Sequence, residues 1–342
     1  MAQGQLWAVN SLGGFYYSLN LSKDLRTGVK ATSKFVQFCD IKDAWSKVTR
    51  AGQTFTWDTV PMMSRANRAL TETSTIPQGQ HTVLQGTLTM SERGFSVPYT
   101  EMLESMSQFT VRQPIMKVLK YDASVDLDCL AWEQFNNTPL RMMASASADA
   151  ASLTTDSIPA GASMTASVAM STTNFKSVVD TMKGRNIPYY TESDYFAIAR
   201  PLQLRGLKNT LEGLSQYSDR GFGMIMNGEV GRSYENVRIV EQTTIPAGGA
   251  YDARYGTGTY NPFTDTSDAW NTPSGAPGTT DWMFIFGADT VCEAIHTPVE
   301  IRSKIPDDYG RSKGIAWYGL MGYGITHTNV TQARIVKWDS AV

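Results

Sequence analysis

Apolar and polar residues alternate from Thr54 to Val60, which is the period of a half-buried β-strand. The same period returns over residues 82–89 and continues through Gly94–Val97. Residues 61–80, between the two runs, are mostly polar and charged. The pattern therefore predicts a long two-stranded hairpin with a polar, charged tip. Because an isolated hairpin is only marginally stable in water, we expect this one to lie against another molecule.

Helical periods stand on both sides of this hairpin. The polar and aromatic residues 1–19 predict an extended arm, and an amphipathic helix is predicted after it, over about residues 20–38. Thr100 is the predicted N-cap of a short helix that reaches about residue 108, because carboxylates follow in its first turn. A longer helix is predicted over residues 114–136, with Pro114 near its start and an apolar stripe at alternating spacings of four and three.

Short strands and a linker are predicted over residues 141–171, and helices and strands alternate over residues 173–245, which is typical of a compact α/β lobe. The elements predicted in the lobe are a helix from Thr173 to the C-cap signature Lys183-Gly184, a strand over 195–199, a helix over 202–214, a strand start at 228–231 and a strand over 237–240.

Residues 247–280 form a segment rich in glycine, proline, threonine and tyrosine that is too long for an ordinary connection. Its aromatic residues favour a loop that docks on a surface. After it, residues 282–286 predict a buried strand, and residues 299–301, 315–321 and 333–338 predict closing antiparallel strands.

Composition excludes several classes of protein. Charged residues make up 18% of the 342 residues, and 30 Lys and Arg stand against 32 Asp and Glu. A surface that grips nucleic acid would show a basic excess, which this chain does not have. No basic segment followed by an apolar stretch begins the sequence, so no signal peptide is expected. No apolar run has the roughly 18–20 residues that a membrane span needs.

Residues that commonly carry catalysis are sparse. The three histidines, His81, His296 and His327, have no metal-binding spacing and are expected to be solvated or at strand edges. Acidic pairs such as Asp126 and Asp128 are expected in turns or on solvated faces. The three cysteines are far apart and odd in number, which favours small buried thiols over disulfides or a zinc site. An enzyme is therefore the weakest class of function for this sequence.

Several short segments, in this order, carry a resemblance to a known family. They are Leu21-x-x-x-Leu25, Gly52-Gln53-Thr54-Phe55-Thr56-Trp57, Leu70-Thr71-Glu72, Val97-Pro98-Tyr99-Thr100-Glu101-Met102-Leu103-Glu104, Tyr195–Pro201, Gly228-Glu229-Val230-Gly231 and Asn236–Glu241. In these segments and in the order of its elements the chain resembles the major capsid proteins of tailed double-stranded-DNA phages, which have the α+β Hong Kong 97-like fold. Within them it is most similar to the family typified by the capsid protein of the short-tailed coliphage N-four. The resemblance covers nearly the whole chain.

The resemblance implies a division of the chain into five segments. They are an N-terminal arm with a short helix (1–47), an extended hairpin or E-loop (48–98), a P-domain with the spine helix (99–172), an A-domain with the long loop 247–280 (173–295), and closing P-domain strands (296–342).

The resemblance also implies that the hairpin reaches across a neighbouring subunit and that the N-terminal arm lies over an adjacent spine helix. The residues expected at interfaces between subunits are Leu25, Phe35, Trp57, Arg65, Arg68, Glu72, Glu92, Arg93 and Trp270. No catalytic, cofactor-binding or metal-binding residue is expected.

The partners implied are other copies of the chain, as hexamers and pentamers of an icosahedral shell that encloses double-stranded DNA without sequence-specific binding. A portal protein at one vertex is implied, and a decoration protein is a further class of partner that the resemblance allows. Because the arm begins within the first residues, a separate scaffolding protein is expected. The chain would lie in the virion, and in the host cytoplasm during assembly, with no membrane contact.

Two other classes of function stay open at this point. An encapsulin-like nanocompartment shell protein shares the fold and encloses an enzyme cargo instead of DNA. A β-rich surface adhesin or carbohydrate-binding protein is suggested by the tyrosine- and tryptophan-rich loop 247–280. The long helix over 114–136 and the absence of a signal peptide argue against the adhesin.

Overall fold

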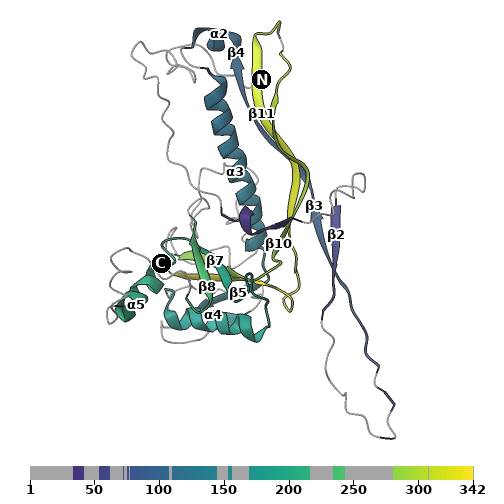
Figure 1. Ribbon diagram of the computed structural model, residues 1–342, viewed down its shortest axis with the longest axis vertical. Coiled ribbons are helices and arrows are strands. Elements are labelled where there is room, and N and C mark those ends of the chain that lie inside the picture. Colours follow the sequence, from purple (N-terminus) through teal and green to yellow (C-terminus); the bar gives the residue numbers. More distant parts are fainter. Residues whose placement is uncertain are drawn as a thin grey trace.

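Three β-sheets organise the part of the chain that the structure describes (Figure 1). The computed structural model describes residues 34–41, 54–61, 72, 75–76, 78–107, 110–144, 153–155, 169–215, 234–242, 280–306 and 308–341. The long sheet has the order β1-β10-β11-β4, with β1 at Asp40–Ile41, β10 at Val291–Ser303, β11 at Ser312–Ile325 and β4 at Ser91–Thr100. The hairpin pairs β2 (Thr54–Thr59) with β3 (Leu84–Thr89).

The third sheet has six strands in the order β6-β5-β12-β9-β7-β8. Their bounds are Leu153–Thr155 for β6, Leu140–Ala144 for β5, Ile335–Ala341 for β12, Thr280–Phe286 for β9, Tyr195–Ala199 for β7 and Val237–Glu241 for β8. The helices are η2 (Val36–Phe38), α2 (Glu101–Met106), α3 (Arg112–Asn136), α4 (Thr172–Gly184) and α5 (Arg205–Ser215). Within the described ranges, no helix is both long and apolar enough to cross a membrane.

Helix α3 runs alongside the long sheet and ends at the six-stranded sheet (Figure 1). Ile115 and Leu119 in its first half share a core with Ile315 of β11. Trp317 of β11 donates a hydrogen bond from Nε1 to Oδ2 of Asp122 at 2.8 Å, which ties the sheet to the helix at mid-length. The helix therefore acts as a rigid spine that joins the two sheets.

The bounds of the two central helices confirm the sequence prediction. Pro114 is the third residue of α3, inside the first turn, where backbone N–H groups have no intrahelical partner and proline costs nothing. The helix ends at Asn136, as predicted. The hydroxyl of Thr100 caps α2 by accepting a hydrogen bond from the backbone N–H of Leu103.

Strand β9 is buried on both faces, as its continuous apolar run predicts. Met283 and Ile285 point into the core under α4, together with Val178 and Trp338. The alternate residues Trp282, Phe284 and Phe286 point to the other face, where they pack on the end of α3. Because side chains alternate across a strand, this single segment serves two cores.

A short N-terminal segment is inserted between the spine and the six-stranded sheet. Phe35 is fully buried, with its ring centroid 5.3 Å from that of Phe135 and 5.9 Å from that of Phe284. Oδ1 of Asp128 on α3 accepts hydrogen bonds from the backbone N–H groups of Lys34, Phe35 and Val36 at 2.9, 2.7 and 3.3 Å. Gln242 donates to Oδ2 of the same carboxylate at 2.7 Å. Asp128 therefore joins the N-terminal segment, the spine and the end of β8.

These contacts correct two predictions from the sequence. Phe35 was expected at an interface between subunits, but its side chain lies in the core of its own chain. Asp128 was expected on a solvated face or in a turn, but it is fully buried. Of the helix predicted over residues 20–38, the described part is the single 3₁₀ turn η2, and its earlier part lies outside the described residues. The partners that fix this segment stand more than 90 positions away, so no local pattern reveals them.

The sheets also cut across the segments predicted from the sequence. The predicted second hairpin strand divides after Thr89: β4 leaves the hairpin and pairs with β11, so residues 91–98 belong to the long sheet. Strands β5 and β12, which were expected in the P-domain, lie next to each other in the six-stranded sheet. The first residues of β10, expected in the A-domain, pair with β11. Which sheet a strand joins depends on pairing between distant segments, which periodicity does not reveal.

Smaller differences concern the ends of two helices. Gly184 was predicted as the C-cap of α4, but it is the last helical residue, and Asn186 takes the left-handed conformation with φ of 56°. Asparagine tolerates this conformation better than most residues. Helix α5 begins at Arg205, three residues later than predicted, because residues 201–204 form a turn after Pro201. The loop at 247–279 and the strand predicted at 228–231 lie outside the described residues.

Burial at Asp128 generates a prediction about pH. Desolvation raises the pKa of Asp128 from 3.8 to about 6, and it outweighs the hydrogen bonds from the N-terminal segment and Gln242 that lower it. Because the pKa is higher in the folded than in the unfolded chain, the folded state binds the extra proton between pH 3.8 and about 6. Stability therefore falls as pH rises through this window, by about 3 kcal/mol at most.

In Asp128→Asn the amide oxygen still accepts the three backbone N–H groups but the side chain does not titrate. We measure the free energy of unfolding with urea at several pH values. In this variant we expect it to lack the decrease that Asp128 causes in the wild type between pH 3.8 and about 6. Burial also raises the pKa values of Asp126 and Glu293, but both proteins keep these residues, so their effects cancel in the comparison. If the free energy of unfolding depended on pH in the same way in the wild type and in Asp128→Asn, the prediction would be contradicted.

Candidate interaction surface

The hairpin has one face that packs on its own chain and one face that does not. Register pairs Phe55 with Leu88 and Trp57 with Gly86 on the inner face. The residues between them on β2 and β3, which are threonines, Asp58 and Gln85, point outward, and most of them are exposed. The alternation seen in the sequence therefore marks a ribbon that is covered on one side.

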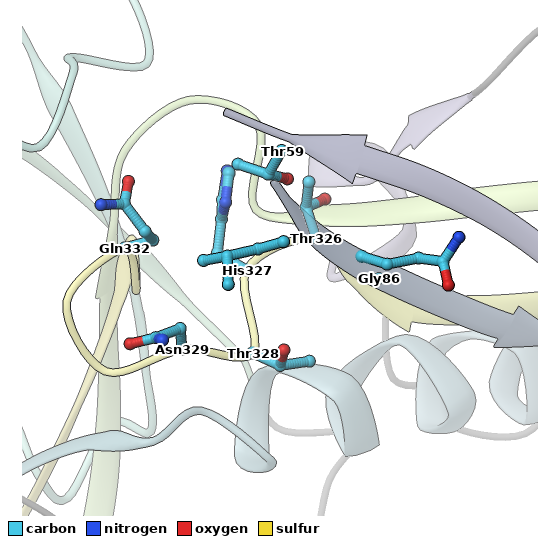
Figure 2. A pocket seen from close by; sticks show the side chains of 9 residues that line it. Thr59, Gly86, Thr326, His327, Thr328, Asn329 and Gln332 are labelled. Atoms are coloured by element: carbon cyan, nitrogen blue, oxygen red, sulfur yellow. The ribbon is translucent and has the colours of Figure 1, made fainter. Parts of the chain in front are cut away.

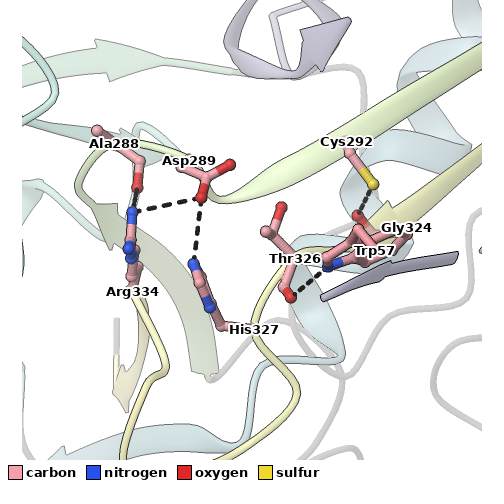
Figure 3. Close-up of polar contacts among 8 residues, drawn as sticks. All are labelled: Trp57, Ala288, Asp289, Cys292, Gly324, Thr326, His327 and Arg334. Carbon is pink, nitrogen blue, oxygen red and sulfur yellow. Dashed lines mark hydrogen bonds and ion pairs between the residues drawn. The ribbon is translucent and has the colours of Figure 1, made fainter. Parts of the chain in front are cut away.

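The inner face of the hairpin sits closely on β11. Leu88 shares a core with Cys292 and Ala294 of β10, and Phe55 and Trp57 pack against it. Trp57 donates from Nε1 to the carbonyl oxygen of Thr326 at 2.9 Å (Figure 3). This hydrogen bond and the Leu88 core hold the root of the hairpin on the long sheet.

Two glycines of β11 make this close approach possible. A Cβ on Gly322 would lie 2.6 Å from the carbonyl oxygen of Thr89, and a Cβ on Gly324 would lie 3.1 Å from the side chain of Leu88 and 3.2 Å from the ring of Trp57. A side chain at position 322 would collide with the hairpin backbone, and one at position 324 would require Leu88 and Trp57 to shift. The sequence predicted a strand at 315–321, which lies within β11, but it did not predict that glycines of this strand allow the hairpin to approach.

Beyond its root the hairpin is exposed. Every described residue from 72 to 83 is exposed, and so is Val60 on the other strand. Ile76 is 75% exposed, Val60 62% and Val83 52%. Figure 1 shows β2 and β3 beside the lower end of the long sheet, with the described residues before β3 extending downward, away from that sheet. Exposed branched apolar side chains on a projecting ribbon are typical of a surface that another molecule covers.

A second exposed apolar group lies at the far end of the long sheet. Met102 and Met106 of α2 are more than half exposed, and Ile305 and Tyr309 in the turn between β10 and β11 are exposed almost completely. Figure 1 places α2 and this turn at the same end of the molecule. Lys313 of β11 forms ion pairs with Glu101 and Glu104, which fixes α2 on the sheet there.

The residues that the sequence predicted at interfaces are placed as follows. Trp57 holds the root of the hairpin within its own chain, and Arg93 pairs with Asp126 of α3 at 3.8 Å. Glu72 and Glu92 are exposed. Leu25, Arg65, Arg68 and Trp270 lie outside the described residues. Among the predicted interface residues that the structure describes, Glu72 lies on the exposed part of the hairpin. The exposed apolar residues Val60, Ile76 and Val83 were not predicted.

Of the three histidines, His327 differs from the expectation; it lines a pocket at the root of the hairpin (Figure 2). His81 is exposed, as expected, but His327 is 5% exposed and lies near Asp289. Two cysteines, Cys129 and Cys292, are buried thiols, and Cys39 is half-buried. Across the described ranges, no group of three or more His, Cys, Asp or Glu side chains is close enough to hold a metal ion.

Comparison with solved structures identifies the fold. The chain superposes on the cyanophage Pam1 capsid protein with a TM-score of 0.61 and 14% identity, over 100% of this chain and 99% of that one. It also matches the capsid of cyanophage P-SCSP1u, with a TM-score of 0.63 and 11% identity over 95% and 93% of the two chains. The head of Helicobacter pylori bacteriophage KHP40 gives a TM-score of 0.64 and 10% identity over 95% and 96%.

No family model matches the sequence. No curated protein matches it either. At these identities, coverage of both chains along nearly their whole length shows a shared fold. The chain therefore has the α+β Hong Kong 97-like fold of phage capsid proteins, as the sequence predicted.

The packing of Trp57 on Gly86 generates a testable prediction. A Cβ on Gly86 would lie 2.4 Å from the indole ring, so Gly86→Ala must displace Trp57 and weaken its hydrogen bond to Thr326. We expect amide hydrogen exchange in β2 and β3 to become about tenfold faster or more, because one lost hydrogen bond and poorer packing exceed about 1.4 kcal/mol.

The control for this experiment is Gly184→Ala at the end of α4, where an added Cβ meets nothing within 4 Å. Exchange in the hairpin should be unchanged in that variant. Wild-type exchange rates in β2 and β3 of Gly86→Ala would show that the hairpin root does not depend on this contact.

Proposed function

We propose that the chain is a major capsid protein that assembles, as hexamers and pentamers, into the icosahedral shell enclosing a phage double-stranded DNA genome. The hairpin carries this proposal. It is a two-stranded ribbon with a fixed root and an exposed apolar outer part, and such a ribbon gains stability when a neighbour covers it. Copies arranged around a closed shell supply that neighbour to every hairpin.

The fold supports the same function. The matched structures come from phage capsids and heads, and the chains correspond along almost their entire length. That favours a capsid over an encapsulin-like nanocompartment or a surface adhesin. In this role the chain belongs to the virion and has no catalytic function. The nearer relation to the N-four family rests on the sequence segments quoted above.

Further partners follow from this function. A separate scaffolding protein would guide assembly, a portal protein would occupy one vertex, and a decoration protein could bind the outside. The net charge of −2 suits a shell that encloses DNA without binding it specifically, since a basic lining would hold phosphates tightly. Ion pairs between subunits at Glu72 and Glu92 belong to the same proposal.

Val83 provides the test of this function. It is 52% exposed in the single chain, so Val83→Asp should leave the thermal unfolding of the subunit within about 0.5 kcal/mol of the wild type. In an assembled shell the same change would place a charge in an apolar contact. We expect the purified wild-type chain to form shells or hexamer sheets in electron micrographs, and the variant to form few or none at the same concentration.

The matched control is Val83→Thr, which keeps the β-branched shape and adds no charge. It should assemble at a concentration within a few-fold of the wild type. A wild-type chain that remains a monomer under all assembly conditions, or a Val83→Asp variant that forms normal shells, would contradict the proposed role of the hairpin.

A further inference from the structure

Residues 34–41, the N-terminal segment, lie in a site that other elements of the subunit build (Figure 1, the purple turn beside α3). Phe35 and Phe38, one turn apart, are its buried anchors. The ring centroid of Phe38 lies 5.2 Å from those of Phe196 and Phe286, in the aromatic core at the end of α3. Beyond the anchors, β1 adds two residues in parallel to β10. One turn and one very short strand therefore place the segment.

A single carboxylate oxygen holds the start of the segment. The turn η2 is closed by hydrogen bonds within the segment, from the N–H groups of Phe38 and Cys39. N–H groups at the start of a helical turn have no partner inside it. Here those of residues 34–36 all donate to Oδ1 of Asp128, at 2.9, 2.7 and 3.3 Å. Asp128 on the spine therefore acts as the cap of a turn that stands more than 90 positions away.

The spine and the six-stranded sheet also contact each other directly, without the segment. The ring centroid of Phe135 on α3 lies 5.1 Å from that of Phe286 on β9. The ring centroid of Trp132 lies 6.2 Å from that of Trp282. Because these contacts do not pass through the segment, its departure leaves the spine in contact with the sheet. A local opening of this kind requires less free energy than unfolding of the whole chain.

A buried carboxylate stands at each end of the segment. Asp128 lies at its start, where Gln242 donates to the second carboxylate oxygen at 2.7 Å. At its other end, Ile41 is the register partner of Glu293 on β10. The side chain of Glu293 is buried and accepts a hydrogen bond from the hydroxyl of Tyr323 at 2.7 Å. Both carboxylates thus accept hydrogen bonds from uncharged donors, which stabilise an ionised carboxylate less than a cation does.

Other titratable or charged groups around the two carboxylates come from the segment, α3, β4 and β11. They are Lys34, Cys39, Asp40, Arg93, Asp126, Glu133 and Tyr323. Burial raises the pKa of Cys39 most, and Glu293 and Asp128 raise it further. The two carboxylates therefore act on the same small region, and each negative charge that forms there disfavours the next.

The protonation of Asp128 is coupled to the position of the segment. Desolvation raises the pKa of Asp128 from 3.8 to about 6, and it also raises the pKa of Glu293. When the segment leaves, water reaches Asp128 and its pKa returns toward 3.8. The docked state then binds the proton more tightly than the released state does. Docking therefore weakens as pH rises from 3.8 to about 6, by at most about a hundredfold in its equilibrium constant.

We propose that the N-terminal segment is a pH-sensitive clasp, which docks while Asp128 and Glu293 are protonated and is released more often once they ionise. It leaves as one unit, because its two anchors belong to one turn. Of residues 1–53, the structure describes 34–41, so release changes how this part of the chain is held on the subunit. The inference concerns the unassembled subunit and does not rest on the proposed capsid function.

Amide hydrogen exchange of the unassembled wild-type chain tests the release, from about pH 4 to about pH 7 and with rates corrected for intrinsic exchange chemistry. The amides of Phe35 and Phe38 report on the segment, and those of β9 report on unfolding of the whole chain. We expect the segment amides to exchange faster than those of β9 at every pH. We also expect their exchange to become about tenfold to about a hundredfold faster across this range, reaching a plateau above about pH 6.

Two substitutions on the same helix separate the clasp from other effects of charge. Asp128→Asn keeps an oxygen that accepts the three N–H groups but does not titrate, so the rise should shrink to a few-fold, the part left to Glu293. Asp126→Asn is the matched control, because Asp126 also has a raised pKa but pairs with Arg93 and not with the segment. This variant should keep the full rise.

Three results would overturn the proposal. Segment amides that exchange at the same rate as those of β9 would show that the segment leaves only when the whole chain unfolds. Exchange in the wild type that does not change with pH would show that ionisation does not control release, and this result needs no variant. Equal rises in the wild type and in a folded Asp128→Asn variant would assign the pH dependence to other groups. Each of these results leaves the capsid function standing, since that function is tested by assembly of the Val83 variants.

Discussion

A two-stranded β-ribbon buries too little of its surface to be stable in water by itself, and this constraint shapes the rest of the molecule. The hairpin meets it at the root, where Trp57 and Leu88 pack on β11 and one hydrogen bond reaches Thr326. Farther out the described residues are exposed, and their apolar side chains are uncovered within this chain. The outer part of the hairpin is therefore left uncovered within this chain.

Strand β11 connects the hairpin to the rigid parts. It pairs with β10 and β4, packs on α3, and carries the glycines 322 and 324 on which the hairpin root rests. It then leads into the turn that holds His327. Helix α3 extends from the long sheet to the six-stranded sheet, and near that end its Asp128 accepts hydrogen bonds from the N-terminal segment. The hairpin root therefore reaches the spine through β11, in addition to the direct continuation of β3 into β4 and the packing of Leu88 on β10.

Local periodicity was enough to predict the spine helix, the hairpin strands and the doubly buried β9, because each depends on residues close in sequence. It could not predict that β4 leaves the hairpin, that β12 enters the six-stranded sheet, or that Phe35 is a core residue. Those outcomes depend on pairings such as Asp128 with Lys34, Phe35 and Val36, more than 90 positions apart. At the interaction surface, the sequence indicated a hairpin that needs a partner. It favoured charged residues there, whereas the structure exposes Val60, Ile76 and Val83.

The most direct measurement places a photo-crosslinking amino acid at position 76, where the side chain is 75% exposed, and assembles equal amounts of ¹⁴N- and ¹⁵N-labelled chains. If a neighbouring copy covers the hairpin, mass spectrometry of the crosslinked peptides will show mixed-label pairs in about half of the products, as random mixing of two equal populations requires. Crosslinks that join only peptides of the same label would show that the hairpin folds back on its own chain, and would contradict the account.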